Sequence, residues 1–175
     1  IISDHDGTID KFEGDAIIAF WGAPLSQPDH AKLSCLACID MQKKLDELRV
    51  EWIKEGLPNV LVRMGVNSGP MVVGNMGSQS RMDYTIMGDS VNLAARLEGA
   101  NKFYKNYSMI SEFTYSQAAD AIDVRELDTI RVVGKNEPIT VYDLIERKNQ
   151  TTGKKADLVN MYNKGLDLYK KRDFS

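Results

Sequence analysis

Residues 8–24, TIDKFEGDAIIAFWGAP, constrain the fold of this chain more than any other segment. They hold two strand-length segments, residues 8–12 and 16–21, and a short Glu-Gly-Asp connection separates them. Glycine in so short a connection favours a tight turn, so the two segments are predicted to pair as an antiparallel hairpin. Residues 16–21 are apolar on both faces, which predicts a central position in the sheet.

A long amphipathic helix is predicted over residues 29–54, with Asp29 as its N-cap and Gly56 and Pro58 beyond its end. Cys35 and Cys38 form a C-x-x-C pair, a pattern found in redox and zinc sites. Both cysteines also lie on the apolar face of the predicted helix. We therefore interpret them as buried core residues.

The remaining segments alternate between strand and helix patterns. Residues 60–67 and 71–75 are predicted to be a strand pair, and residues 77–84 a polar loop. The further prediction is a helix over 88–98, a strand over 107–110, a helix over 112–119 capped by Ser111, and strands over 124–127, 130–133 and 139–145. This order predicts an α+β fold with helices on a largely antiparallel sheet.

Composition excludes some classes of partner. The chain carries 22 basic and 25 acidic side chains, a net charge of −3, so nothing favours nucleic acid. No apolar run approaches the ~20 residues that span a bilayer, so this segment is not predicted to contact a membrane. With no signal peptide, we expect a cytoplasmic location, either alone or as the cytoplasmic part of a membrane-anchored protein.

The segment TIMGDSVNLAARLEGA, residues 85–100, carries the clearest chemistry. Asn92 and Arg96 lie four residues apart on a predicted helix and so share one face. In a cleft, this pair could stabilise charge on a phosphoryl group or orient a ribose. The spacing alone is more typical of a solvated helix face, and the common glycine-rich phosphate motifs are absent.

Two segments together, DKFEGDAIIAFWGAP and YTIMGDSVNLAARLE, resemble the catalytic domain of class III nucleotidyl cyclases, the adenylyl and guanylyl cyclases. VRMGVNSGPMVVGNMGS and GKNEPITVYDL resemble that family at its intervening and closing strands. The resemblance covers residues 1–147. It implies a ferredoxin-like βαββαβ-type fold, ATP or GTP as substrate, two divalent cations (Mg²⁺ or Mn²⁺), and a homodimer with shared active sites.

The resemblance also implies roles for single residues. Asp15 matches one of two aspartates that bind the cations. Lys11 and Thr85 match the two positions that read the purine. Lysine donates to the adenine ring nitrogen and opposes the N1–H of guanine, so this pair favours ATP over GTP.

Three further positions concern the ribose and the phosphates. Asn92 matches the residue that orients the ribose, and Arg96 matches the arginine that stabilises the reacting phosphate. Lys135 matches a lysine that holds the triphosphate. The implied reaction is attack of the ribose 3′-oxygen on the α-phosphorus, which yields cyclic AMP and pyrophosphate. In this family one subunit supplies the metal aspartates and its partner supplies the other side chains.

The sequence departs from the family pattern in several places. The strand that carries the first metal aspartate, a motif like F-x-D-I-x-G-F-T, is not found, and Asp4 and Asp6 are weak substitutes for it. Val133 and Pro70 replace basic residues of some members. The alternatives are therefore a catalytically silent cyclase-like dimerisation or regulatory module, and a guanylyl cyclase.

The chain is predicted to continue beyond this domain. Residues 148–157 form a polar linker, and residues 158–175 carry a C-terminal amphipathic helix. The segment MYNKGLDLYKKRDF resembles the first helix of a tetratricopeptide repeat, with Gly165 and Leu168 at its small and large packing positions. An ordinary amphipathic helix explains the same pattern, and both interpretations remain open.

Overall fold

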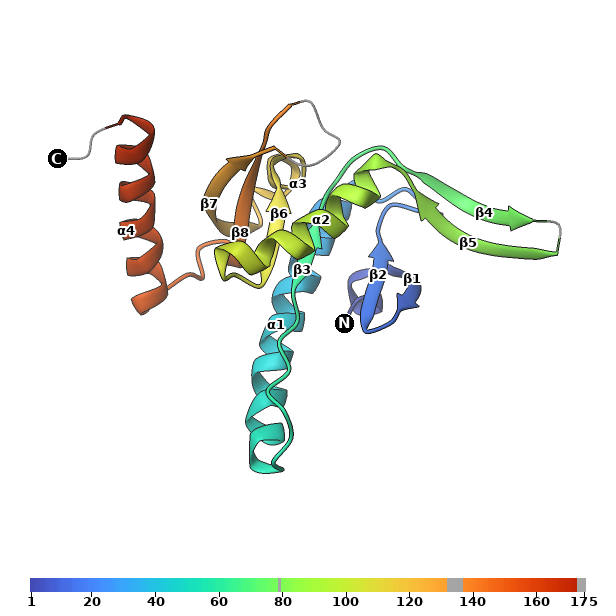
Figure 1. Cartoon of the computed structure of the whole chain (residues 1–175), viewed down its shortest axis with the longest axis horizontal. Helices are drawn as coiled ribbons and strands as arrows, with labels where there is room; N and C mark the ends of the chain where they lie inside the picture. The colour runs from blue at the N-terminus through green and yellow to red at the C-terminus, as the bar shows by residue number, and fades with distance from the viewer. Residues whose placement is uncertain (79, 132–136, 173–175) are drawn as a thin grey trace.

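The computed structural model describes residues 1–78, 80–131 and 137–172 (Figure 1). The described elements follow in chain order: 3₁₀ helix η1 (Ser3–His5), β1 (Thr8–Glu13), β2 (Ala16–Phe20), α1 (His30–Lys54), β3 (Met64–Val66), β4 (Val72–Ser78), β5 (Arg81–Met87), α2 (Asp89–Tyr104), β6 (Ser108–Ser111), α3 (Glu112–Ala118), β7 (Ile122–Ile130), β8 (Ile139–Arg147) and α4 (Gly153–Lys170).

The described strands form one four-stranded sheet and two hairpins. The sheet has the order β3-β6-β8-β7, with β3 and β6 parallel and the other pairs antiparallel. The hairpins are β1–β2 and β4–β5. Figure 1 shows β4–β5 projecting from one side of the molecule, while α4 lies at the other. The α+β fold class, with helices around mostly antiparallel strands, is confirmed.

The hairpin over residues 8–21 is confirmed, but the central position of its second strand is wrong. Glu13 pairs with Ala16 across a turn in which Gly14 has φ 62°, a conformation that glycine adopts without strain. Among the described strands, β2 pairs with β1 alone. The other edge of β2 therefore has no strand partner among the described residues, and Ile17 remains 52% exposed.

The predicted pairing of residues 60–67 with 71–75 is also wrong. Gly65 of β3 pairs with Met109 of β6, a strand far along the chain, while Gly74 of β4 pairs with Thr85 of β5. Much of the predicted loop over 77–84 belongs to this second hairpin. The local sequence pattern identified the strand-forming segments of this region. It did not identify which strands pair, because contacts between distant segments select the pairs.

Two further boundaries differ from the prediction. Helix α2 extends to Tyr104, well beyond residue 98. Strand β7 is continuous from Ile122 to Ile130, where two separate strands were expected, and its register against β8 shifts between Glu126 and Asp128. Of the strand predicted over 130–133, Ile130 ends β7, residue 131 is not in a strand, and residues 132 and 133 lie outside the described residues.

Helix α1 and its cysteines agree with the prediction. The helix begins after Asp29 and ends at Lys54. Both thiols are buried in the core beside Ile39 and Ile110. Burial raises the pKa of Cys38 to about 12 and that of Cys35 still further. The thiols are therefore inert core groups rather than reactive ones.

Helix α2 lies directly against β3. A Cβ at Gly65 would stand 2.2 Å from the Ala94 carbonyl oxygen and 2.3 Å from the Glu98 nitrogen, so only glycine allows this approach. Leu93 and Leu97 fill the core on the same side of the helix. This packing fixes the rotation of α2, and hence the direction of its remaining faces.

Helix α4 lies at the periphery and has no buried residue. It is attached to β7, where the Tyr162 hydroxyl donates to the Leu127 carbonyl (3.0 Å) and the Arg125 guanidinium lies 4.6 Å from the Tyr162 ring centroid. The helix begins at Gly153, inside the segment expected to be a linker.

Candidate active site

Lys11 and Thr85, the two predicted purine-reading residues, converge on a third side chain. The Thr85 hydroxyl donates to Oδ2 of Asp10 at 2.9 Å, and the Lys11 ammonium lies 3.6 Å from the same oxygen. The Asp10 side chain is only 2% exposed, whereas that of Lys11 is 45% exposed. A buried carboxylate thus joins a buried hydroxyl to an ammonium group that reaches solvent.

A β-bulge explains how neighbouring residues of β1 meet at one point. Ile9 pairs with Ala19 and Lys11 with Ile18, so Asp10 is the extra residue of the pair. In a regular strand, the side chains of Asp10 and Lys11 would point to opposite faces. The bulge changes this alternation, as bulges beside functional sites often do. Sequence reasoning missed Asp10 because an irregularity in strand register leaves no sequence pattern.

Asn92 and Arg96 lie one turn apart on α2, as predicted from their spacing. Asn92 is exposed, and Arg96 is half-buried. Nη1 of Arg96 is buried without a hydrogen-bond partner in the described part of the chain. The side chain lines a surface cavity of ≈ 540 Å³ together with Ala100, Phe103 and Arg131. An unpaired buried guanidinium N–H beside a cavity is available to bind an anion.

A partly buried polar network holds the start of α2. Asn67 Nδ2 donates to the Ser90 carbonyl (2.9 Å), and the Ser111 hydroxyl donates to Asn67 Oδ1 (2.7 Å). Ser111 also caps α3 by accepting from the Thr114 backbone nitrogen. The ends of β3 and β6 are thus tied to the first turn of α2, which presents Asn92.

Asp15 lies in the exposed turn between β1 and β2. No side chain in the described ranges pairs with its carboxylate. Mg²⁺ in phosphate-handling sites is usually held by one or two carboxylates together with substrate phosphates and water. Asp15 fits one such ligand. The described residues contain no group of three or more histidine, cysteine or acidic side chains that could hold a metal.

The structure says little about the remaining positions that were named from the sequence. Lys135 and Val133 lie outside the described residues. The carboxylate of Asp4 pairs with the amino group of Ile1 at 3.1 Å, and Asp6 has a left-handed backbone conformation at the end of η1.

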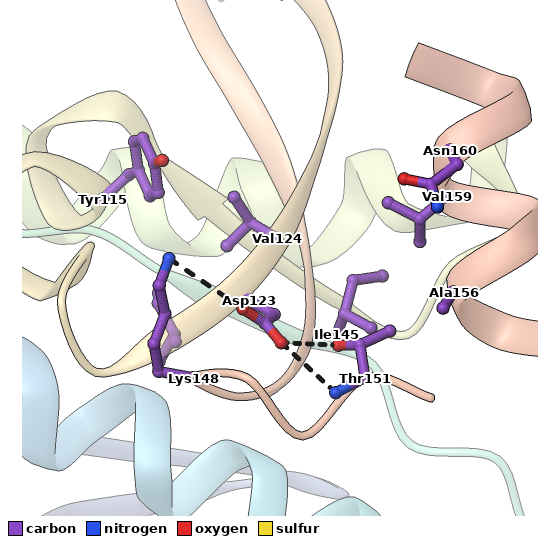
Figure 2. A pocket seen from close by; sticks show the side chains of 10 residues that line it. Tyr115, Asp123, Val124, Ile145, Lys148, Thr151, Ala156, Val159 and Asn160 are labelled. Atoms are coloured by element: carbon purple, nitrogen blue, oxygen red, sulfur yellow. Dashed lines mark hydrogen bonds and ion pairs between the residues drawn. The ribbon is translucent and has the colours of Figure 1, made fainter. Parts of the chain in front are cut away.

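A second cavity, of ≈ 300 Å³, lies between β7, the end of β8 and α4 (Figure 2). Asp123 accepts from the Thr151 hydroxyl at 2.9 Å, and its other oxygen lies 3.9 Å from the Lys148 ammonium. This threonine–aspartate–lysine group has the same composition as the group around Asp10. None of the predicted site residues lines it.

Comparison with known proteins gives a consistent assignment. The family described as the adenylate and guanylate cyclase catalytic domain matches residues 1–146. Adenylate cyclase 1 of Rhizobium meliloti (strain 1021) is 34% identical over 145 residues, which cover 83% of this chain and 22% of that protein. The chain therefore spans less than a quarter of that relative.

Two solved structures are similar to this chain to the same degree. The adenylyl cyclase CyaB from P. aeruginosa is 37% identical, with a TM-score of 0.76 and coverage of 87% of this chain and 78% of that one. The guanylyl cyclase Cya2 is 34% identical, with a TM-score of 0.76 and coverage of 85% and 75%. Since these two neighbours act on different purines, the backbone alone does not select the base.

Within the described ranges, no helix has the length and hydrophobicity needed to cross a bilayer.

Proposed function

The chain belongs to the adenylate and guanylate cyclase catalytic domain family, and we propose that it is an adenylyl cyclase domain that converts ATP to cyclic AMP and pyrophosphate. The observation that carries the choice of ATP is the convergence of Lys11 and Thr85 on one buried carboxylate. Side chains held in place before the substrate arrives lose little entropy on binding, so they can discriminate between bases.

In the proposed complex, the Lys11 ammonium donates to N1 of adenine, and the Thr85 oxygen lies near its 6-amino group. Guanine carries a proton at N1, which the lysine would repel. Adenine is therefore the base that fits this pair. The similarity to adenylyl cyclases of 34% and 37% identity supports the same choice.

Asn92 and Arg96 are proposed to handle the ribose and the phosphates. The Asn92 amide, exposed on α2, orients the ribose so that its 3′-oxygen faces the α-phosphorus. The Arg96 guanidinium donates to the phosphoryl oxygens as charge builds up during attack. Its buried Nη1, which has no partner in the part of the chain that the structure describes, supports this role. Lys135 is proposed to hold the triphosphate.

Asp15 is proposed to bind the divalent cations. When bound, two Mg²⁺ or Mn²⁺ ions would lower the pKa of the 3′-hydroxyl and neutralise the leaving pyrophosphate. The chain itself would contribute one metal-binding carboxylate, which it holds at a fixed turn. The antiparallel pairing of β1 with β2 on either side of Gly14 keeps that turn in place.

We further propose a homodimer in which Asp15 of one subunit faces Lys11, Thr85, Asn92 and Arg96 of its partner. Large apolar side chains are exposed along both hairpins, as in surfaces that associate; they include Phe12, Ile17, Val72, Met82 and Met87. A site shared between subunits also accounts for the position of Asp15 outside the group around Asp10.

We place the catalytic domain at residues 1–147, followed by a separate C-terminal helical segment. The family match ends at residue 146, and α4 has no buried residue. Leu158, Met161 and Leu168 are exposed on α4. This surface is compatible both with an ordinary amphipathic helix and with the first helix of a tetratricopeptide repeat.

A direct assay tests the proposed activity. The chain is incubated with Mn²⁺ and either ATP or GTP, and cyclic nucleotide is quantified by mass spectrometry. A second chain carries the family's F-x-D-I-x-G-F-T strand ahead of Ile1, so that both metal aspartates are supplied. We expect cyclic AMP from the second chain and a clear preference for ATP.

Two outcomes would contradict this proposal. If the extended chain binds ATP but forms no cyclic nucleotide, the silent dimerisation or regulatory module is correct. If it forms cyclic GMP faster than cyclic AMP, the domain is a guanylyl cyclase.

A further inference from the structure

We propose that Asp10 is the positioning residue that sets base specificity, because it fixes the direction in which the Thr85 hydroxyl points. This inference rests on the proposed adenylyl cyclase function and deepens it. Asp10 was not among the residues expected to act at the site. It comes from the bulge in β1, and its partner comes from β5.

The argument begins with the hydrogen-bonding capacity of the two groups. An ionised carboxylate accepts hydrogen bonds and donates none, whereas a hydroxyl carries one proton and two lone pairs. At 2.9 Å from Oδ2 of Asp10, the Thr85 hydroxyl must give its only proton to the carboxylate. The Thr85 oxygen is then left with lone pairs alone and acts toward a ligand only as an acceptor.

Burial makes this direction persistent. The Asp10 side chain is 2% exposed, and Thr85 is buried as well, so water does not compete for the bond. A hydrogen bond to a charged acceptor is stronger than one between neutral groups. The Lys11 ammonium, 3.6 Å from the same oxygen, compensates the charge of the carboxylate and is itself drawn toward Thr85.

The Lys11 ammonium, which donates, and the Thr85 oxygen, which accepts, match the hydrogen-bonding groups of adenine and oppose those of guanine. Position 6 of adenine carries an amino group, which donates, and position 6 of guanine carries an oxygen, which accepts. A Thr85 oxygen restricted to accepting would face a second acceptor if guanine were bound. Without Asp10, the hydroxyl could rotate and donate to that oxygen. Asp10 therefore restricts the Thr85 hydroxyl, which could otherwise donate or accept, to accepting a hydrogen bond from the base.

The test measures base preference in three variants. Asp10→Ala removes the acceptor, Asp10→Asn retains an amide oxygen that accepts, and Thr85→Val removes the hydroxyl. For each we would determine kcat/KM with ATP and with GTP in the extended chain. Competition of ATP and GTP against a fluorescent ATP analogue would give the ratio of their affinities, which is independent of the chemical step.

We expect Asp10→Ala to lower the ATP-to-GTP ratio by about 10- to 100-fold, the range for one mispaired buried hydrogen bond. Asp10→Asn should retain more of the ratio than Asp10→Ala. In the Thr85→Val background, Asp10→Ala should change the ratio less than it does alone, because the two residues act through one bond.

The group around Asp123 provides a matched control. Its carboxylate also accepts from a threonine hydroxyl at 2.9 Å and lies near a lysine, but it stands beneath α4 (Figure 2). Asp123→Ala should leave the ATP-to-GTP ratio unchanged, even if it lowers stability.

An unchanged ratio in Asp10→Ala would overturn the inference, and so would full additivity with Thr85→Val. A role in folding alone would lower both activities and leave the ratio intact. Failure of the proposed function would appear instead in the extended chain without substitutions, as absence of activity or preference for GTP.

Discussion

Arg96 is the clearest single residue at which structure and chemistry agree. The packing of Leu93 and Leu97 against the sheet sets the direction of its side chain, and within the described residues its Nη1 has no hydrogen-bond partner beside a cavity. A buried N–H without a partner costs about 1–3 kcal/mol. Such a cost is commonly carried at a site where a ligand supplies the missing acceptor.

The first prediction concerns this guanidinium. Arg96→Ala should lower kcat by about 10²–10³, as the loss of one charge-stabilising donor does in other enzymes, with a smaller effect on the binding of ATP. The measurement is steady-state cyclic AMP formation. Lys102→Ala, an exposed change on the same helix, is the control. A rate close to that of the unsubstituted chain would remove Arg96 from the proposed mechanism.

At the scale of elements, one charged cluster joins three parts of the chain. Asp40 of α1 accepts from Arg147, at the end of β8, at 2.7 and 2.9 Å, and it lies 2.9 Å from Nε2 of His5 in η1. Burial alone would raise the pKa of Asp40, but the hydrogen bonds from Arg147 and His5 outweigh it, so the pKa is lowered. The cluster therefore ties the N-terminal hairpin region to α1 and the sheet.

The second prediction follows from the sign of that shift. A carboxyl group with a lowered folded pKa stabilises the protein above its unfolded pKa of about 3.9, and this contribution is lost as pH falls through the folded value. Asp40→Asn should thus reduce the free energy of unfolding by about 1–2 kcal/mol at pH 7. The difference between the two proteins should shrink below about pH 4.

Urea unfolding at pH 7 and at pH 3.5 measures this difference. Asp46→Asn removes a more exposed partner of Arg49 on the same helix, and its effect should stay below about 1 kcal/mol. A difference for Asp40→Asn that is equally large at both pH values would show that the carboxylate charge is not what stabilises the cluster.

At the scale of the whole molecule, both hairpins are separate from the four-stranded sheet, and β4–β5 extends away from it (Figure 1). They carry both the group around Asp10 and the exposed apolar side chains, which include Phe12 and Met82. Catalysis and association are therefore proposed to use the same part of the molecule. In the proposed arrangement, a monomer would carry the base-reading and metal-binding groups but would not combine them in one site.

The third prediction tests this shared site. Asp15→Asn and Arg96→Ala chains, each in the extended form, should be nearly inactive alone. Mixed at equal concentrations, they should regain activity, because one of the two sites in a heterodimer then has both groups intact. Size-exclusion chromatography shows whether dimers form. Dimers without recovered activity would contradict a site shared between subunits.

The sequence by itself determined the elements with strong local signals. The turn in the first hairpin, the long helix α1 with its buried cysteines, and the capping of α3 by Ser111 were predictable, because each depends on residues close together in the chain. The position of Asn92 and Arg96 on one face of α2 followed from their helical spacing.

Only the tertiary structure decided which strands pair and which side chains meet. The pairing of β3 with β6 depends on contacts between distant segments, and Gly65 shows its importance only once α2 lies against it. Asp10 is the strongest case: a register shift in β1 and the approach of β5 bring it to Thr85, 75 positions along the chain. Neither event has a local pattern, because both are set by the free energy of packing between segments far apart in sequence.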